Sequence, residues 1–213
     1  MSMTREETCE IILREKLIAI VRVRDAGNVP VLIAGLVAGG ISVLEITTNS
    51  PDFTVKIKEN RERYPDILIG AGTVTNRDLA IKAIDAGAQF LVSPNTHSGV
   101  ISVAHDHNIP VVMGALTPTE VGEALEQGAD IIKLFPAGNF GPSYLKAIKA
   151  PFDKGRFFAV GGIHLENMEK WMESGADGLG LGSVLTHIDG LKLTEEIVAH
   201  NARKYVEKIK QYE

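Results

Sequence analysis

The sequence predicts an α/β protein folded as a single (β/α)8 barrel, a TIM barrel, with an extra helix near its N-terminus. Eight short, apolar, β-branched runs alternate along the chain with longer segments of helical period. Most of these runs are almost wholly apolar, which is typical of parallel strands buried on both faces. Several helical segments end in glycine just before the next run, so one helix-turn-strand pattern recurs along the chain.

The first expected element is a polar segment at about residues 4–16, which we interpret as the extra helix, laid across the bottom of the barrel. It carries Cys9, the only cysteine among 213 residues, which therefore has no partner for an internal disulfide and is expected to be a partly buried helix thiol. The eight strands are expected at residues 17–23, 43–47, 67–70, 90–93, 110–113, 131–134, 156–160 and 178–181.

Amphipathic helices are expected between these strands, among them residues 29–38, 76–86, 117–127 and 164–174, and residues 191–211 would complete the outer ring. Glycines are expected at the C′ position of several helices: Gly39-Gly40, Gly87, Gly128 and Gly175. Neither end of the strand series has the polar character of an edge strand, so a closed barrel is favoured over an open doubly wound sheet. Because no linker-like stretch interrupts the chain, residues 1–213 are expected to form one domain.

Composition and charge exclude several classes of partner. The net charge is −5 and basic residues are scattered, whereas nucleic-acid binding requires clustered Lys and Arg. No apolar run approaches the ~20 residues of a membrane span, and the opening MSMTREETCE lacks the cationic and apolar parts of a signal peptide. We therefore expect a cytoplasmic protein that binds neither nucleic acid nor membranes.

Two charged residues interrupt apolar strands, where barrel enzymes carry their reacting groups. Lys133, in the run IIKLFP, should have a desolvated amine with a lowered pKa, which suits attack on a ketone; the alternative is a lysine that extends to the barrel rim. Glu45, in the run VLEIT, is a candidate proton shuttle if it faces inward near Lys133. The alternative for Glu45 is a structural ion pair with Lys133 or Arg22.

Other candidates follow the ends of the strands. Two glycine-rich turns, at Gly161-Gly162 and Gly180-Leu181-Gly182-Ser183, come after the last two strands, where barrels of this class bind phosphate through backbone N–H groups. Thr73 is a candidate for binding a substrate carboxylate, or else a threonine bonded only to backbone. Arg22 is a candidate cation for a carboxylate or phosphate, with a rim salt bridge as the alternative.

The histidines do not indicate a metal site. His105 and His107 are two residues apart in a predicted helix, where their side chains diverge, and no third ligand has suitable spacing. No metal is therefore assigned.

The chain resembles the class I aldolases of the 2-keto-3-deoxy-6-phosphogluconate (KDPG) and 4-hydroxy-2-oxoglutarate (KHG) family. The resemblance spans nearly the whole chain and rests on the order and spacing of six motifs: EIT at 45–47, GAGTV at 70–74, VSPN at 92–95, KLFPA at 133–137, Gly161-Gly162 and Gly182-Ser183. It implies a homotrimer that needs no cofactor.

The resemblance also implies a role for each candidate. Lys133 would form the Schiff base with the keto carbon, and Glu45 would be the general acid and base. Cleavage of 2-keto-3-deoxy-6-phosphogluconate would give pyruvate and glyceraldehyde 3-phosphate. The remaining implied contacts are Thr73 with the pyruvate-end carboxylate, Pro94 and Phe135 in the pocket wall, and Gly161, Gly162 and Ser183 with the phosphate.

Two positions depart from the gluconate-type pattern. Asn49 stands where many members have an arginine, and Val160 stands where they have a threonine, so Arg22 would have to replace the missing cation or the substrate differs. Both positions look more like the branch that cleaves 2-keto-3-deoxy-6-phosphogalactonate. 4-Hydroxy-2-oxoglutarate, which lacks a phosphate, is a third possible substrate.

Two other kinds of protein would share part of this pattern. A phosphate-binding barrel isomerase would need the two glycine-rich turns but no inward lysine. A non-catalytic sugar-phosphate sensor would bind its ligand without turnover.

Overall fold

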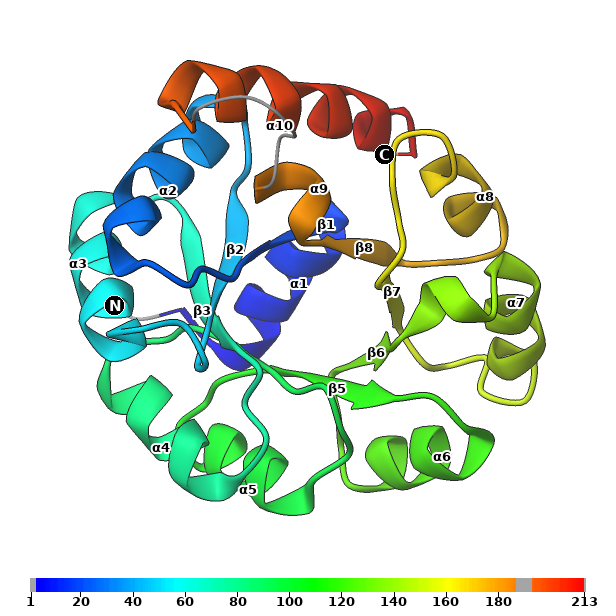
Figure 1. Ribbon diagram of the computed structural model, residues 1–213. Coiled ribbons are helices and arrows are strands. Elements are labelled where there is room, and N and C mark those ends of the chain that lie inside the picture. The colour runs from blue at the N-terminus through cyan, green and yellow to red at the C-terminus, as the bar shows by residue number, and fades with distance from the viewer. Residues whose placement is uncertain (1–2, 187–192, 213) are drawn as a thin grey trace.

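The computed structural model describes residues 3–186 and 193–212, and in them eight parallel strands close into a barrel (Figure 1). The strands follow one another in chain order, and β1 pairs with β8 to close the ring. Helices surround the barrel, and α1 lies across one end of it (Figure 1). The predicted (β/α)8 barrel with an extra N-terminal helix is confirmed, and the open sheet is excluded.

The strands lie where the apolar runs predicted them, with differences at their ends. They are β1 (Leu17–Val21), β2 (Val43–Thr47), β3 (Leu68–Gly72), β4 (Leu91–Val92), β5 (Val111–Ala115), β6 (Ile131–Leu134), β7 (Phe157–Val160) and β8 (Gly178–Leu181).

β7 begins one residue later than predicted, and β1 and β4 are each two residues shorter than predicted because a side chain or a proline interrupts their backbone hydrogen bonding. β1 ends at Val21, and the Val23 amide donates to the Ser50 hydroxyl (3.1 Å) instead of a strand carbonyl. β4 contains only two residues, since it is followed by Ser93, whose hydroxyl donates to the Asn95 carbonyl (2.7 Å), and by Pro94, which has no amide to donate. β5 is longer than predicted, because Gly114 and Ala115 still pair with β6.

The helices are α1 (Arg5–Glu15), α2 (Val29–Ala38), α3 (Phe53–Arg63), α4 (Arg77–Asp85), α5 (Ser98–Asp106), α6 (Pro118–Glu126), α7 (Pro142–Lys149), α8 (Met168–Glu173), α9 (Ser183–Thr186) and α10 (Glu195–Ile209). Short 3-10 turns occupy Ala26–Asn28, Ala137–Asn139 and Lys210–Tyr212. None of the described helices is both long and apolar enough to cross a membrane.

Helix ends explain most differences from prediction. Asn76 and Thr117 are N-caps whose side chains accept from the amides of Leu79 and Glu120, so α4 and α6 begin one residue later than expected. The helix predicted at residues 164–174 begins only at Met168, because residues 164–167 form a turn in which the Asn167 side chain accepts from the His164 amide (2.9 Å).

At the C-terminal end of the chain, α10 begins at Glu195 after its cap Thr194. Of the helix predicted at 191–211, residues 191–192 lie outside the described residues. The predicted C′ glycines are confirmed at Gly40, Gly87, Gly128 and Gly175, where φ is 90–94°, whereas Gly39 is a right-handed cap with φ −83°.

Two apolar clusters form the core. The larger one fills the space between strands and helices, and the smaller one fills the lower interior of the barrel. The smaller cluster includes Ile12 from α1, Val43 from β2 and Ile131 from β6. Because alternate residues of a strand face the same side, the residues two places farther along, Glu45 and Lys133, face the barrel interior above this cluster.

Candidate active site

Lys133 lies in β6 and is almost completely buried, with 4% of its surface exposed. Its Nζ atom lies 5.0 Å from the ring centre of Phe135. Burial lowers the pKa of the Lys133 amine; the charge of Glu45 opposes this shift and that of Arg22 adds to it. The prediction of a desolvated lysine is therefore confirmed, and the alternative of a lysine extended to the rim is wrong.

Glu45 lies in β2 and is 1% exposed. Burial raises the pKa of its carboxyl group, and the positive charges of Lys133 and Arg22 oppose that shift. Among the described residues, its Oε1 atom has no hydrogen-bond partner, and no ion pair joins Glu45 to Lys133 or Arg22. The structural ion pair considered as an alternative is thus absent, and a buried carboxyl with a spare acceptor faces the barrel interior.

Gly72, at the end of β3, makes room for this carboxyl group. A Cβ atom on Gly72 would overlap the Glu45 carboxylate. The Glu45 carboxyl group can therefore lie where it does only because residue 72 has no side chain.

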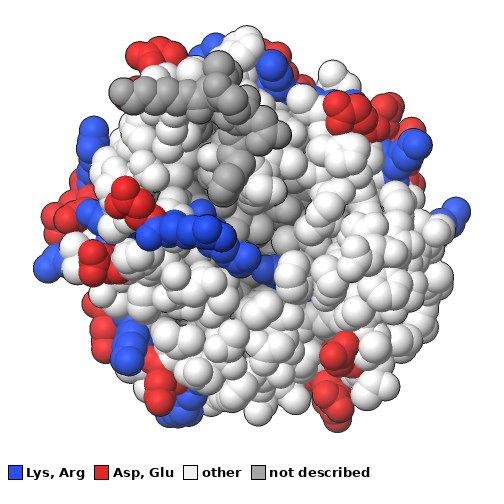
Figure 2. Space-filling view, in the orientation of Figure 1, with Lys and Arg blue, Asp and Glu red and all other residues white. Residues whose placement is uncertain are grey.

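A cavity of about 940 Å³ opens at the carboxyl ends of the strands. Figure 2 shows this face, on which basic side chains, in blue, extend from the left toward a hollow near the centre. The volume is that of a small-molecule site. Of the predicted site residues, six line the cavity: Arg22, Lys133, Phe135, Gly161, Gly162 and Ser183.

Arg22 and Thr73 contact each other above Glu45. The Arg22 guanidinium donates to the Thr73 hydroxyl across 3.3 Å, and the Thr73 carbonyl accepts from the Thr48 hydroxyl (2.7 Å). Thr73 has a φ of 59°, in the left-handed region. Within the described chain Arg22 forms no salt bridge, so the rim ion pair considered for it is absent.

Pro94 follows β4 and is partly buried. Its carbonyl lies so close to Gly114 of β5 that a Cβ atom there would overlap it. In the described part of the chain, neither Pro94 nor Glu45 nor Thr73 belongs to the cavity wall. These three predicted residues therefore lie beneath or beside the cavity.

The two glycine-rich turns lie beside each other at the cavity. Gly161 and Gly162 follow β7 and have φ values of 96° and 72°, which side-chain-bearing residues rarely adopt. Ser183 begins the short helix α9 directly after β8, and its side chain is exposed. Since β7 pairs with β8, with Val160 opposite Gly180, both turns reach the same side of the cavity.

His105 and His107, to which the sequence analysis assigned no metal, contact different partners. His105 lies 3.1 Å from Asp130, and His107 contacts the Val103 carbonyl (2.8 Å). They do not converge on a common point.

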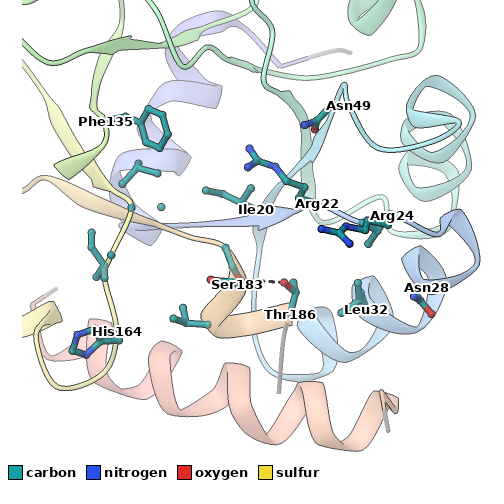
Figure 3. Close-up of a pocket in the computed structure, with 18 of the residues that line it drawn as sticks. Ile20, Arg22, Arg24, Asn28, Leu32, Asn49, Phe135, His164, Ser183 and Thr186 are labelled. Carbon is teal, nitrogen blue, oxygen red and sulfur yellow. Dashed lines mark hydrogen bonds between the residues drawn. The ribbon is translucent and has the colours of Figure 1, made fainter. Parts of the chain in front are cut away.

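Several cavity residues were not singled out from the sequence. Arg24 and His164 are both part of the wall (Figure 3). Asn49 and Val160, which the sequence had already marked as departures from the gluconate-type pattern, also line the cavity. Arg24 and His164 each stand a few residues after a strand end, so the rule that identified Arg22 and Gly161 would also have found them.

Comparisons with known proteins match this arrangement. The family of KDPG and KHG aldolases matches residues 9–200. A 2-dehydro-3-deoxy-6-phosphogalactonate aldolase of Escherichia coli is 40% identical over 79% of this chain and 83% of its own length. A 2-dehydro-3-deoxy-phosphogluconate aldolase of Treponema pallidum is 34% identical over 76% of this chain and 78% of its own.

Solved structures agree with the sequence comparison. A native KDPGal structure superposes with a TM-score of 0.85 at 36% identity, covering 92% of this chain and 95% of the other. The KDPG aldolase of Legionella pneumophila, with pyruvate captured as a covalent carbinolamine, superposes with a TM-score of 0.79 at 29% identity, covering 93% and 94%.

Proposed function

This chain belongs to the KDPG and KHG aldolase family and is a carbon–carbon lyase, and we propose that it cleaves a phosphorylated 2-keto-3-deoxy sugar acid through a Schiff base on Lys133. Membership of an aldolase family favours this reaction over the phosphate-binding isomerase and the non-catalytic sensor. The observation that carries the assignment to Lys133 is its burial at the base of a cavity, with a lowered pKa.

The chemistry follows from the two buried ionisable groups. A neutral Lys133 amine attacks the keto carbon C2, and loss of water from the carbinolamine gives an iminium ion. The C4 hydroxyl then loses its proton and becomes a carbonyl group, and the electrons of the C3–C4 bond move into the iminium. The fragment that begins at C4 leaves as an aldehyde. The resulting enamine takes up a proton at C3, and hydrolysis of the imine releases pyruvate and regenerates the amine.

Glu45 is the group that we assign to these proton transfers. Because burial raises its pKa, the Glu45 carboxyl group takes up a proton more readily than an exposed glutamate, which suits a group that must both accept and donate a proton. Its unpaired Oε1 leaves an acceptor available for the substrate or for a water molecule. Covalent capture of pyruvate in the Legionella relative supports the same type of intermediate here.

The two ends of the substrate have different surroundings. We assign the keto-acid carboxylate to Arg22 and Thr73, with Pro94 and Phe135 beside the reacting carbons. Gly161, Gly162 and Ser183 are assigned to the phosphate, because backbone amides at glycine turns can approach an anion that a side chain would block.

The identity of the sugar acid is a finer question. The sequence predicted 2-keto-3-deoxy-6-phosphogluconate, and the phosphogluconate relatives support it. Two observations favour 2-keto-3-deoxy-6-phosphogalactonate: Asn49 and Val160 both line the cavity, and the relative that is 40% identical is a phosphogalactonate aldolase. We therefore place phosphogalactonate first and phosphogluconate second, with 4-hydroxy-2-oxoglutarate third because it leaves the phosphate site unused.

Incubation with pyruvate and borohydride, followed by peptide mass mapping, tests the mechanism. One reduced pyruvate should be found on Lys133, and Lys133→Met should not be labelled. Lys58→Met, which removes an exposed lysine of α3, is the matched control and should be labelled like the wild type. A wild-type protein that gains no mass would overturn the Schiff-base mechanism.

Steady-state cleavage of the two phosphorylated epimers then decides the substrate. A higher kcat/KM for phosphogalactonate would support the order given above, and a higher value for phosphogluconate would restore the sequence-based prediction. The predicted homotrimer and the predicted independence from cofactors are tested by light scattering and by activity in the presence of a chelator.

A further inference from the structure

Arg24 lines the cavity, but the proposed mechanism assigns it no role. It lies in the loop that follows β1, two residues beyond Arg22, and its side chain is exposed. Within residues 3–186 and 193–212, Arg24 forms no ion pair or side-chain hydrogen bond. An arginine that faces a cavity without an acceptor has all of its guanidinium donors available for a ligand.

The two arginines occupy different parts of the cavity. Arg22 donates to Thr73 and its charge acts on both Lys133 and Glu45, so it belongs to the end where the keto acid reacts. Arg24 does not contribute to either of those pKa shifts. In Figure 3 its guanidinium points toward the side of the cavity where Ser183 and Thr186 lie, whereas that of Arg22 extends in the direction of Phe135 and Asn49.

The sheet pairing brings the Arg24 loop next to the second glycine-rich turn. β1 pairs with β8, with Ala19 opposite Leu181, so the carboxyl ends of these two strands are neighbours. α9, which begins with Ser183, packs against β1. The loop after β1 and the turn after β8 therefore share one side of the cavity.

The charges of the cavity wall also favour this assignment. A phosphorylated keto acid carries a carboxylate and a phosphate, and the latter has a charge of ~−1.5 to −2 near neutral pH. Two other ionisable groups of the wall already have partners: His164 Nδ1 lies 2.6 Å from a Glu166 carboxylate oxygen, and the Asp25 carboxylate accepts from the Gly27 amide (2.9 Å). Since Arg22 is assigned to the carboxylate, Arg24 is the arginine of the described cavity wall that can bind the phosphate.

We propose that Arg24 binds the phosphate group of the substrate, together with Ser183 and the Gly161-Gly162 turn, and so makes the enzyme selective for phosphorylated keto acids. This inference rests on the proposed function for the identity of the substrate. Arg24 would form charge-assisted hydrogen bonds to phosphate oxygens, which a planar guanidinium can make two at a time.

The first test compares substrates with and without phosphate. Arg24→Ala should lower kcat/KM for the phosphorylated keto acid by about 10- to 100-fold, since the loss of a hydrogen bond to a charged group weakens binding by about that factor. It should leave kcat/KM for the unphosphorylated analogue, and pyruvate trapping on Lys133, within about twofold. Arg24→Lys should retain part of the selectivity, and Arg24→Glu should lose more than the alanine variant.

Arg77→Ala is the matched control. Arg77 is an exposed arginine at the start of α4, on the same face of the barrel but outside the cavity wall in the described residues. This substitution should leave kcat/KM unchanged for both substrates. An equal loss for the two substrates in Arg24→Ala, or no loss at all, would overturn the proposal.

A binding measurement separates this inference from the proposed reaction. Calorimetric titration with glycerol 3-phosphate, which has no keto group, needs no Schiff base and no turnover. Arg24→Ala should weaken this binding about 10-fold or more, while Arg77→Ala should not. Absence of pyruvate trapping would contradict the mechanism alone, whereas equal affinity of wild type and Arg24→Ala for glycerol 3-phosphate would contradict the role of Arg24 alone.

Discussion

Glu45 and Lys133 lie on opposite sides of the barrel interior, and burial shifts the pKa of each toward its uncharged form. β2 and β6 are separated by three strands in either direction around the closed barrel. The charge of each residue partly restores the ionised form of the other, although no ion pair joins them. The two groups are therefore coupled through space across the site.

This coupling predicts how the pH dependence of the amine changes when the carboxylate is removed. The negative charge of Glu45 raises the pKa of Lys133, so Glu45→Gln should lower that pKa further. Because only the neutral amine attacks a ketone, the pH at which pyruvate trapping reaches half its maximum should decrease. The rate of covalent trapping with cyanoborohydride across pH measures this midpoint. Glu123→Gln, on the exposed side of α6, is the control, and a midpoint that stays or rises in Glu45→Gln contradicts the coupling.

The same two groups should reduce the stability of the fold. Lys133 has a lowered folded-state pKa, so its penalty applies at pH values below its unfolded pKa and is relieved as pH rises. Glu45 has a raised folded-state pKa, so its penalty applies at pH values above its unfolded pKa and is relieved as pH falls. Near neutral pH both penalties are present.

The double variant Glu45→Met with Lys133→Met should therefore be inactive but more stable than the wild type. Replacement of buried ionic groups by apolar side chains of similar volume has increased stability by about 1–4 kcal/mol in other proteins. For a chain of this size each kcal/mol raises Tm by about 2–4 °C. Calorimetric Tm at pH 7 is the measurement, and a Tm below the wild-type value would show that the pair stabilises the fold.

Gly72 should be essential for the position of Glu45. In Gly72→Ala the added Cβ would overlap the carboxylate, so the side chain must move away from its place above the apolar cluster. A displacement of about 1 Å in a reacting group can reduce turnover by about 100-fold. We expect kcat to fall by that order while the far-ultraviolet circular dichroism stays native.

The matched control is Gly122→Ala in α6. A Cβ there would meet only the Phe152 ring, at 3.8 Å, which is an ordinary contact. Alanine in a helix interior should stabilise this variant by about 0.5–1 kcal/mol, with activity unchanged. Full activity in Gly72→Ala would mean that Glu45 can act from another position.

The sequence was most informative where an apolar run is interrupted by a single charge. Residues 131–134 were predicted and found as a strand, and the burial of Lys133 followed from its neighbours. The barrel also followed from the sequence, because each helix-turn-strand unit has its own local signals. These features depend on residues close to one another in the chain.

The features that were not predicted depend on contacts between distant segments. The end of β1 is set by the bond from the Val23 amide to Ser50, 27 residues away. The unpaired Oε1 of Glu45 and its close approach to Gly72 could be recognised only once β2 and β3 were placed side by side. Arg24 follows the end of β1 and meets the same rule as Arg22, but its lack of an ion-pair partner among the described residues could be recognised only in the structure.

Cys9 should be almost unreactive in the folded protein. The structure confirms that it is a partly buried thiol on α1, where burial, with a smaller contribution from the negative charge of Asp130, raises its pKa to about 11. At pH 8 about one thiol in a thousand would then be ionised, and the thiolate is the form that reacts. A thiol-specific reagent such as Ellman's reagent should therefore label Cys9 slowly in buffer and rapidly in denaturant. Cys9→Ala should retain full cleavage activity, since the thiol lies beside the apolar cluster at the bottom of the barrel, away from the cavity. Fast labelling of the native protein would contradict the burial of the sulfur atom.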